Sequence, residues 1–314
     1  MGLAARAVAR RGAWGVLASL ALGAGGVHAE EAQDWQLGFQ PAASVVRERI
    51  DFLHNVILLP IITVISLFVL GLLLWVIIRY NAKRNPVPTK IAHNTTIEIL
   101  WTLVPALILV VIAFPSFRLL YFMDKAVHAD MTLKVTGHQW YWSYEYPDQN
   151  GVSFDSNMIP EADVAKLHKK RLLDVDFPVV LPVNTTIRVL ITGTDVIHSW
   201  FVPSFGVQEY AVVGRTNESW VKIDREGTFY GQCNQICGLN HPFMPIEVKA
   251  VSSDKFKTWS TCVLAAPDKA KEKAKTDPKW REEDERAECY QPLETAGADA
   301  ARVAANAADS DAVK

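Results

Sequence analysis

Two long apolar runs lie in the first half of the chain and predict a pair of membrane-spanning helices. Residues 52–78 contain no charged side chain, and residues 99–117 form a second run without charge. At about 1.5 Å per residue, each run is long enough to cross the hydrocarbon core of a bilayer. Including their flanks, we expect transmembrane helices over residues 51–81 and 97–123.

The segment between these helices, residues 82–96, predicts their orientation. It carries Lys83, Arg84 and Lys90 and no acidic residue. Short loops rich in Lys and Arg stay on the cytoplasmic side of a membrane. We therefore expect a cytoplasmic linker, with both outer ends of the helical hairpin on the exported side.

Residues 1–29 match the three-part pattern of a cleavable secretory signal. Three arginines lie among the first eleven residues, followed by an apolar run over residues 13–22 and small residues ending at Ala29. An uncleaved membrane helix is the alternative, but this run is short for a bilayer. We expect cleavage near Ala29, which leaves residues 30–50 as an N-terminal segment on the exported side.

After residue 124 the pattern changes to short β-branched and aromatic segments bounded by Pro, Gly, Asn and Asp. Such segments are typical of strands, and several at this spacing favour a sandwich or Greek-key barrel. Examples are M-T-L-K-V-T, P-V-V-L-P, T-I-R-V-L-I-T and P-I-E-V-K-A-V. We predict an all-β Greek-key sandwich over residues 124–262, preceded by the two-helix transmembrane hairpin.

The tail, residues 263–314, has no pattern that predicts a core. Residues 268–288 hold seven basic and eight acidic side chains, and residues 291–314 are rich in alanine. We expect residues 268–288 to be solvated and either helical or disordered, and residues 291–314 to be disordered. Cys262 and Cys289 flank the charged stretch, and in an exported domain they are predicted to form a disulfide. The alternative is two unrelated thiols.

Composition narrows the class of protein. Hydrophobic residues make up 50% of the chain and concentrate in the two apolar runs, which indicates a membrane anchor. The net charge is −2, and no Lys/Arg-rich patch alternates with aromatic residues, so we expect no nucleic-acid partner. Four cysteines are too few for a disulfide scaffold.

The stretch Y-G-Q-C-N-Q-I-C-G-L-N-H-P-F-M, residues 230–244, carries the candidate chemistry. It contains two thiols, Cys233 and Cys237, the imidazole of His241 and the thioether of Met244. These soft and borderline donors favour copper, and a mononuclear blue-copper site needs only one Cys. The second Cys therefore predicts two copper ions bridged by thiolates. The alternative is a local disulfide, which the neighbouring imidazole and thioether disfavour.

The loop lacks a second imidazole, and His198 is the best candidate. In a cupredoxin-type sandwich, one ligand comes from an earlier strand end and the others come from one loop near the C-terminus. His198, in D-V-I-H-S-W, follows the predicted strand R-V-L-I-T-G and fits that plan. A hydrogen-bonded structural histidine is the alternative, and His128, His138 and His168 fit it better.

The charge-free hairpin and three motifs together resemble subunit II of cytochrome c oxidase, with its CuA centre. The motifs are G-H-Q-W-Y-W-S-Y-E-Y, D-V-I-H-S-W and C-N-Q-I-C-G-L-N-H-P-F-M. The resemblance covers roughly residues 50–260 and implies a cupredoxin-like domain. It implies that Cys233 and Cys237 bridge two coppers, with His198 and His241 as terminal ligands and Met244 as a weak axial ligand.

The resemblance also implies a role for Gln235, between the two cysteines. Its backbone carbonyl would be a copper ligand whatever its side chain. The family commonly has Glu at this position, and that carboxylate also reaches a magnesium ion at the junction with subunit I. Gln235 offers only a neutral oxygen, which holds a hard cation less firmly. We expect an intact copper site and leave the magnesium contact open.

By the same resemblance, Trp140 is the surface residue at which electrons arrive from cytochrome c. An alternating strand would place Trp140, Trp142 and Tyr144 on one face. Of the two tryptophans, we expect Trp140 to expose its indole and Trp142 to lie in the core. Acidic side chains nearby would steer a basic cytochrome c. Each is otherwise an ordinary solvated charge, and the candidates are Glu145, Asp148, Asp176 and Asp195.

Glu98 stands immediately before the second apolar run. It is either a carboxylate at the membrane edge or a proton-accessible group at the mouth of a membrane partner. The resemblance implies the second role, at the opening of a proton-uptake path shared with subunit I.

The sequence therefore predicts the electron-accepting subunit of a bacterial cytochrome c oxidase. Electrons would pass from cytochrome c through CuA to haem in subunit I, where oxygen is reduced to water and protons are pumped. The expected partners are subunit I, other oxidase subunits, cytochrome c and the inner membrane, with the C-terminal domain in the periplasm. The alternative is a membrane-tethered periplasmic copper carrier, which needs an exposed and exchangeable site.

Overall fold

The computed structural model describes residues 30–293, except residues 88, 125–127, 274, 276–278 and 280. The predicted signal over residues 1–29 and the end of the tail, residues 294–314, lie outside the described residues.

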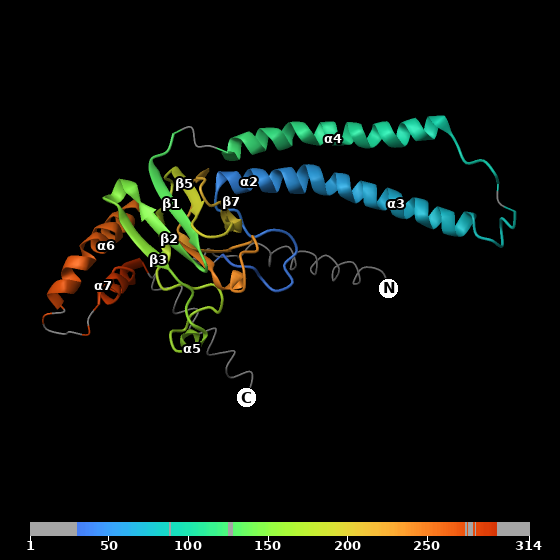
Figure 1. Cartoon of the computed structure of the whole chain (residues 1–314). Coiled ribbons are helices and arrows are strands. Elements are labelled where there is room, and N and C mark those ends of the chain that lie inside the picture. The colour runs from blue at the N-terminus through green and yellow to red at the C-terminus, as the bar shows by residue number, and fades with distance from the viewer. Residues whose placement is uncertain are drawn as a thin grey trace, which may run out of the picture. The chain divides into compact units, whose positions relative to one another are not determined.

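Two long apolar helices precede the β-domain, as the sequence predicts. The first runs without a break as α2 (Val45–Phe52), the π-helical η1 (Leu53–Leu58) and α3 (Leu59–Arg79); the second is α4 (Thr95–Asp124). Figure 1 shows these two long helices beside each other. Both are long and apolar enough to cross a membrane, and the side chains of their most apolar stretches are exposed. A surface this apolar fits the hydrocarbon core of a bilayer and not water.

The C-terminal part is a β-sandwich built from ten strands among the described residues. One sheet has the order β3-β2-β1-β5-β8, a second has the order β4-β10-β9, and β6 and β7 form a ribbon. β1 pairs with β5, and β4 with β10, in parallel, while the other pairs are antiparallel. The strands are β1 (Met131–His138), β2 (Tyr141–Tyr146), β3 (Val152–Ser156), β4 (Val179–Pro182), β5 (Ile187–Gly193), β6 (His198–Val202), β7 (Val207–Ala211), β8 (Asn217–Val221), β9 (Gly227–Gln232) and β10 (Pro245–Val251).

Short helical turns connect these strands. They are η2 (Pro147–Gln149), α5 (Glu161–Val164), η3 (Pro203–Phe205) and η4 (His241–Phe243).

The core follows from the alternation of side chains along the strands. On β2, Trp142, Tyr144 and Tyr146 point inward and are at most 1% exposed, while the residues between them are only partly buried. β4 and β10 are buried at nearly every position, because the segment that contains Val175 covers Glu247 of β10 and a C-terminal helix packs on β4. Strands covered on both faces lose the period-two pattern.

Of the two alternatives for the charged stretch, a helix or disorder, the structure shows helices in the part of the tail that it describes. Helix α6 (Ser253–Lys273) and helix α7 (Glu282–Glu288) are followed by η5 (Gln291–Leu293), so the predicted domain boundary at residue 262 falls inside a helix. The buried residues of α6 repeat at helical spacing and pack on the sandwich. They are Phe256, Trp259, Val263, Ala266 and Ala270.

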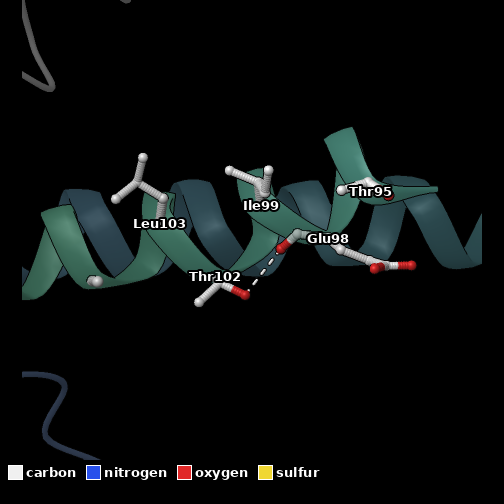
Figure 2. A pocket seen from close by; sticks show the side chains of 6 residues that line it. Thr95, Glu98, Ile99, Thr102 and Leu103 are labelled. Carbon is white, nitrogen blue, oxygen red and sulfur yellow. Dashed lines mark hydrogen bonds between the residues drawn. The ribbon is translucent and has the colours of Figure 1, made fainter. Parts of the chain in front are cut away.

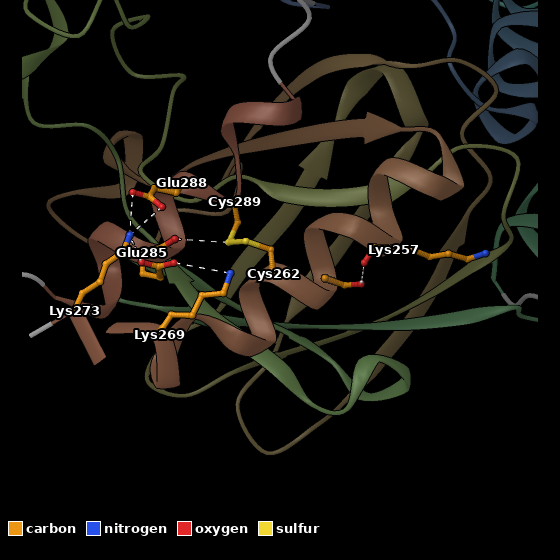
Figure 3. Close-up of a disulfide and its surroundings, with 8 residues drawn as sticks. Lys257, Cys262, Lys269, Lys273, Glu285, Glu288 and Cys289 are labelled. Atoms are coloured by element: carbon orange, nitrogen blue, oxygen red, sulfur yellow. Dashed lines mark hydrogen bonds and ion pairs between the residues drawn. A yellow bond between two sulfur atoms is a disulfide. The ribbon is translucent and has the colours of Figure 1, made fainter. Parts of the chain in front are cut away.

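The predicted disulfide between Cys262 and Cys289 is confirmed and joins α6 to the end of α7 (Figure 3). Between the same helices, the buried carboxylate of Glu285 lies 2.7 Å from Lys273 Nζ, and Lys273 also pairs with Glu288 at 3.2 Å. The abundant charges of this stretch therefore pair with one another across a helical hairpin.

Candidate metal centre

The candidate metal ligands converge at one end of the sandwich. β9 and β10 form an antiparallel pair whose last partners are Gln232 and Pro245, so residues 233–244 form the loop that joins them. β6 packs beside β9, and His198 is the first residue of β6. Residues 35 positions apart in the sequence, His198 and Cys233, thereby come into contact distance.

Two thiols and an imidazole form the buried centre of this cluster. The ligand atoms of His198, Cys233 and Cys237 all lie within 4.8 Å of one another, and each residue is at most 5% exposed. The two Sγ atoms are 3.9 Å apart, so the local disulfide is not formed. The loop adds His241 Nδ1 and Met244 Sδ, each 3.6 Å from Cys237 Sγ.

His198 is held so that one ring nitrogen faces the thiols. Its Nε2 atom lies 2.8 Å from a carboxylate oxygen of Asp195, while the buried Nδ1 atom has no hydrogen-bond partner. Gly137 at the end of β1 makes room for the ring, because a Cβ there would lie 2.9 Å from His198 Cδ2. A buried nitrogen without a partner beside two thiols is the arrangement expected of a metal ligand whose other nitrogen is fixed by a carboxylate.

The thiols differ in acidity in the metal-free chain. Burial raises the pKa of Cys233, but the neighbouring imidazole of His198 and the backbone of Ser199 outweigh it and bring that pKa down to about 7. Burial and the neighbouring Cys233 raise the pKa of Cys237 to about 12. A single negative charge is therefore stable in the pair without a metal, and a cation is needed to hold both as thiolates.

Two further contacts complete the donor set. The Cys233 thiol donates to the backbone carbonyl of Gln235 at 3.3 Å, which places this carbonyl beside the two thiols. The indole N–H of Trp142 donates to the carbonyl of Met244 at 3.2 Å and holds the thioether residue at the loop end. The residues present therefore fit copper, because thiolate, imidazole and thioether are its preferred ligands.

Trp140 is in direct contact with this loop, but it differs from the prediction in two ways. β2 begins at Tyr141, so Trp140 belongs to the turn between β1 and β2 and does not share the inward face of Trp142. Its indole is half-buried, not exposed, because it packs against the copper loop. Its Nε1–H donates to the backbone carbonyl of Cys237 at 3.2 Å.

Comparison with known proteins shows the family of the chain. The family model described as "Cytochrome C oxidase subunit II, periplasmic domain" matches residues 131–251, and its transmembrane-domain counterpart matches residues 32–119. "Probable cytochrome c oxidase subunit 2" of Rickettsia bellii is 52% identical over 231 residues, 74% of this chain and 85% of that protein. The chain belongs to the cytochrome c oxidase subunit II family.

Two further proteins illustrate the range of similarity. Cytochrome c oxidase subunit 2 of Oenothera berteroana is 49% identical over 244 residues, 76% of this chain and 94% of that protein. The crystal structure of the periplasmic domain of subunit II (CoxB) of Bradyrhizobium japonicum is 45% identical, with a TM-score of 0.41. It aligns with 48% of this chain and 99% of that domain.

The chain is therefore the electron-accepting subunit of a cytochrome c oxidase, and its partners are other subunits of that oxidase. It is a membrane protein in which two apolar helices precede a C-terminal β-domain. The His198–Cys233–Cys237 cluster is suited to copper.

The four predicted docking acids are not grouped as a single patch on this subunit II. Glu145 pairs with Lys134 at 2.8 Å on the outer face of β2. Asp148 follows the far end of β2, where it accepts the N–H of Thr132, so the six residues of β2, roughly 20 Å, separate it from Trp140. Neither lies beside the indole.

The other two predicted acids lie near the copper end of the sandwich. Ser156 of β3 pairs with Trp142, which places Asn157 and its hydrogen-bond partner Asp176 at that end. Asp195 is there as well, but its oxygens are already used by three donors: the N–H groups of Gln139 and Val196 and the imidazole of His198. These hydrogen bonds outweigh burial, which raises the pKa of Asp195, and the net effect is to lower it.

Glu98 lies in the first turn of α4 and is partly exposed. One carboxylate oxygen accepts the backbone N–H of Asn94 at 3.1 Å, and His93 Nδ1 lies 3.8 Å away. Figure 2 shows Glu98 between Thr95 and Thr102 along a hollow on this helix, where the hydroxyl of Thr102 donates to the carbonyl of Glu98. The carboxylate thus also acts as a cap for the helix N-terminus.

Three residues with a place at the site were missed by sequence reasoning. Gln139 donates its side-chain amide to the carbonyl of Cys237, and Asp155 lies next to Ser143 and Tyr141 near the Trp140 turn. Gly137 gives His198 its space. Gly137 and Gln139 lie in the motif G-H-Q-W-Y-W, which could have indicated them, whereas no motif indicated Asp155.

Proposed function

We propose that the chain binds a dinuclear CuA centre and receives electrons there from cytochrome c. Cys233 and Cys237 would bridge the two copper ions, with His198, His241 and Met244 as the remaining side-chain ligands. The Gln235 carbonyl completes the set through its backbone. A thiolate-bridged copper pair, when bound, supplies a one-electron redox site whose charge change is shared between two ions.

The observation that carries this proposal is the pair of reduced thiols 3.9 Å apart, with an unpartnered imidazole nitrogen beside them. One buried Cys with two His and a Met would favour a mononuclear site. Two thiols at this spacing, with donors on both sides, support two metal ions. The cluster is buried, which disfavours the exposed and exchangeable site of a copper carrier.

The same arrangement supports Trp140 as the residue where electrons arrive. Its indole reaches the surface on one side and donates a hydrogen bond to the Cys237 carbonyl on the other. The route from the surface to a metal ligand is thus one side chain and one hydrogen bond long. The electron would then leave to haem in subunit I, where oxygen is reduced to water with proton pumping.

The proposed setting is the bacterial inner membrane, with the β-domain in the periplasm. The basic linker over residues 82–96 supports a cytoplasmic position for the closed end of the hairpin. A magnesium ion at the contact with subunit I would be held less firmly than with Glu, because Gln235 contributes no charge.

An EPR spectrum of the detergent-solubilised full chain, reconstituted with copper, tests the dinuclear site. One unpaired electron shared equally by two copper nuclei gives a seven-line hyperfine pattern, which we expect for the wild type and not for Cys237→Ser. The exposed-site substitution Gln208→Leu is a matched control that keeps the wild-type spectrum. A four-line pattern in the wild type would show a mononuclear site and overturn the proposal.

Stopped-flow reduction of the copper-loaded protein by cytochrome c tests Trp140. We expect Trp140→Gln to slow reduction of the protein by at least about tenfold, because the indole that is held in contact with the loop is lost. The EPR spectrum should be unchanged. Tyr141→Phe, which changes the neighbouring ring, is the control. Wild-type rates in Trp140→Gln would leave the indole with a packing role only.

A further inference from the structure

Gln139 makes contact with both sides of the candidate copper site. Its side-chain amide donates to the carbonyl of Cys237 at 3.1 Å, beside the indole N–H of Trp140, which reaches the same oxygen at 3.2 Å. Its backbone N–H donates to Asp195 Oδ2 at 2.7 Å, and the other oxygen of Asp195 lies 2.8 Å from His198 Nε2. Gln139 therefore links the loop ligand Cys237 to the strand ligand His198.

The loop leaves room for this double contact because Cys237 is followed by glycine. A Cβ on Gly238 would lie 3.0 Å from Trp140 Cζ2 and 3.3 Å from Gln139 Nε2. Gly238 also has φ +122°, which side-chain-bearing residues rarely adopt. The two side chains thus pack directly on the backbone of the loop and share the two lone pairs of one carbonyl oxygen.

We propose that Gln139 is a positioning residue for electron transfer, a role that rests on the function proposed above. Its amide holds the Cys237 peptide against the Trp140 indole, so that the indole hydrogen bond remains formed. Without the amide, the Cys237 carbonyl has the indole as its remaining side-chain donor on that side. The Cys237 peptide is then held less firmly, so its hydrogen bond with the indole breaks more often and the short route from Trp140 to Cys237 is lost.

This role differs from that of a surface residue that binds cytochrome c. A docking residue changes the concentration of cytochrome c needed for half-maximal rate and leaves the rate at saturation unchanged. A positioning residue lowers the rate at saturation. Gln139→Glu separates the two, because the added negative charge strengthens attraction of a basic partner while the carboxylate cannot donate to the carbonyl.

The test uses the assembled, copper-loaded oxidase with Gln139→Leu and Gln139→Glu, and Gln208→Leu on β7 as control. We expect both Gln139 variants to lower the saturated rate of copper reduction at least fivefold, with the EPR spectrum of the wild type. The half-saturating cytochrome c concentration should change less than twofold in Gln139→Leu and fall in Gln139→Glu. Gln208→Leu should match the wild type in every measurement.

A second measurement uses the metal-free full chain. The fluorescence of Trp140 is the difference between the wild type and Trp140→Phe, and the same difference is taken in the Gln139→Leu background. We expect lower anisotropy for this Trp140 component in Gln139→Leu, because the indole is less restrained. Unchanged anisotropy would overturn the positioning role, even if electron transfer is slow.

Other outcomes also separate the two proposals. A wild-type saturated rate in both Gln139 variants with slower transfer in Trp140→Gln would overturn the role of Gln139 and leave the electron route intact. Wild-type transfer in Trp140→Gln would overturn the route itself. An altered EPR spectrum in Gln139→Leu would show that the residue holds the metal ligands and not the indole, and would overturn its role toward Trp140.

Discussion

At the scale of single residues, the structure shows how neighbours give a common side chain an uncommon role. His198 becomes a candidate metal ligand because Asp195 occupies one ring nitrogen, Gly137 leaves space for the ring, and Trp142 packs edge-on at 6.0 Å. The same residue type at position 138 makes hydrogen bonds through both nitrogens, to Thr194 and to Ser143. His138 has no nitrogen left for a metal, which is why only one of the two fits the site.

A second residue, Glu247, carries an acidic group in the core away from the metal. It lies on β10 opposite Tyr230 and is 3% exposed, with its carboxylate accepting the N–H of Val175 at 3.0 Å. Burial and the nearby Asp174 raise its pKa from 4.5 to about 7, against the opposing effects of Lys249 and Lys169. The protonated form is therefore the one that the fold favours.

We expect Glu247→Gln to be more stable than the wild type at neutral and alkaline pH. Because folding raises its pKa, the neutral carboxyl of Glu247 makes its full contribution to the free energy of unfolding below pH 4.5. This contribution is lost as the pH rises through about 7. The difference in pKa corresponds to about 3 kcal/mol, so the variant should be more stable at pH 8 by up to that amount and nearly equal at pH 4.5. Denaturant unfolding of the full chain in detergent at both pH values measures this.

Glu145→Gln, on the outer face of β2, is the control for loss of a carboxylate. Its stability should follow that of the wild type at both pH values. If Glu247→Gln loses stability with rising pH as steeply as the wild type does, the buried carboxyl of Glu247 is not the titrating group.

At the scale of elements, sequence patterns predicted the parts whose burial has one simple period. Long uncharged runs indicated the two apolar helices, and alternating residues indicated the strands around Trp142 and Tyr144. Helix α6 was missed because its apolar stripe, which includes Trp259 and Val263, crosses the expected domain end at residue 262 and continues into the many charges of residues 268–288. Those charges, such as Lys273 and Glu285, are satisfied between α6 and α7, which only the folded arrangement shows.

The metal centre, too, could be predicted from the sequence only in part. The copper ligands could be named from the sequence because few residue types bind copper and four of them lie within twelve positions. The contacts of Gln139, Asp195 and the Cys237 carbonyl could not, because they join three segments that are distant in the sequence. Trp140 was expected to be exposed because residue type alone does not show that the loop covers it.

The disulfide is predicted to hold α7 against α6. Cys262 and Cys289 are 27 positions apart, and for a loop of this size the entropy lost by the unfolded chain corresponds to about 3.5 kcal/mol. We expect the double substitution Cys262→Ser/Cys289→Ser to lower the free energy of unfolding by about 2–4 kcal/mol in denaturant titrations. The copper EPR spectrum should remain that of the wild type, because neither residue touches the metal cluster.

Thr258→Ser, an exposed change on α6, serves as the control and should be neutral. A double Ser variant with wild-type stability would mean that the packing of Trp259 and Tyr290 alone fixes the hairpin. Loss of the copper signal would instead show that the C-terminal hairpin supports the metal loop.

At the scale of the whole molecule, the chain places two chemically different groups in two different parts. The β-domain holds the His198–Cys233–Cys237 cluster, and the apolar hairpin carries Glu98 at the start of α4. An acidic group at the edge of an apolar helix is either a helix cap or a proton-accessible group for a membrane partner. The structure supports the cap directly, through the N–H of Asn94, and leaves the second oxygen available for the proposed proton path.

Substitution of Glu98 distinguishes these two roles in the assembled oxidase. The amide oxygen of Gln accepts the same hydrogen bond from the N–H as Glu, but Gln cannot exchange a proton. Ala can neither accept this hydrogen bond nor exchange a proton. If the carboxyl supplies protons, Glu98→Gln and Glu98→Ala should both lower steady-state turnover severalfold, and stopped-flow reduction of copper by cytochrome c should be unchanged. Glu48→Gln, an exposed acid on α2 at the other end of the hairpin, should leave both rates unchanged. Wild-type turnover in Glu98→Gln with loss only in Glu98→Ala would assign the residue to helix capping alone.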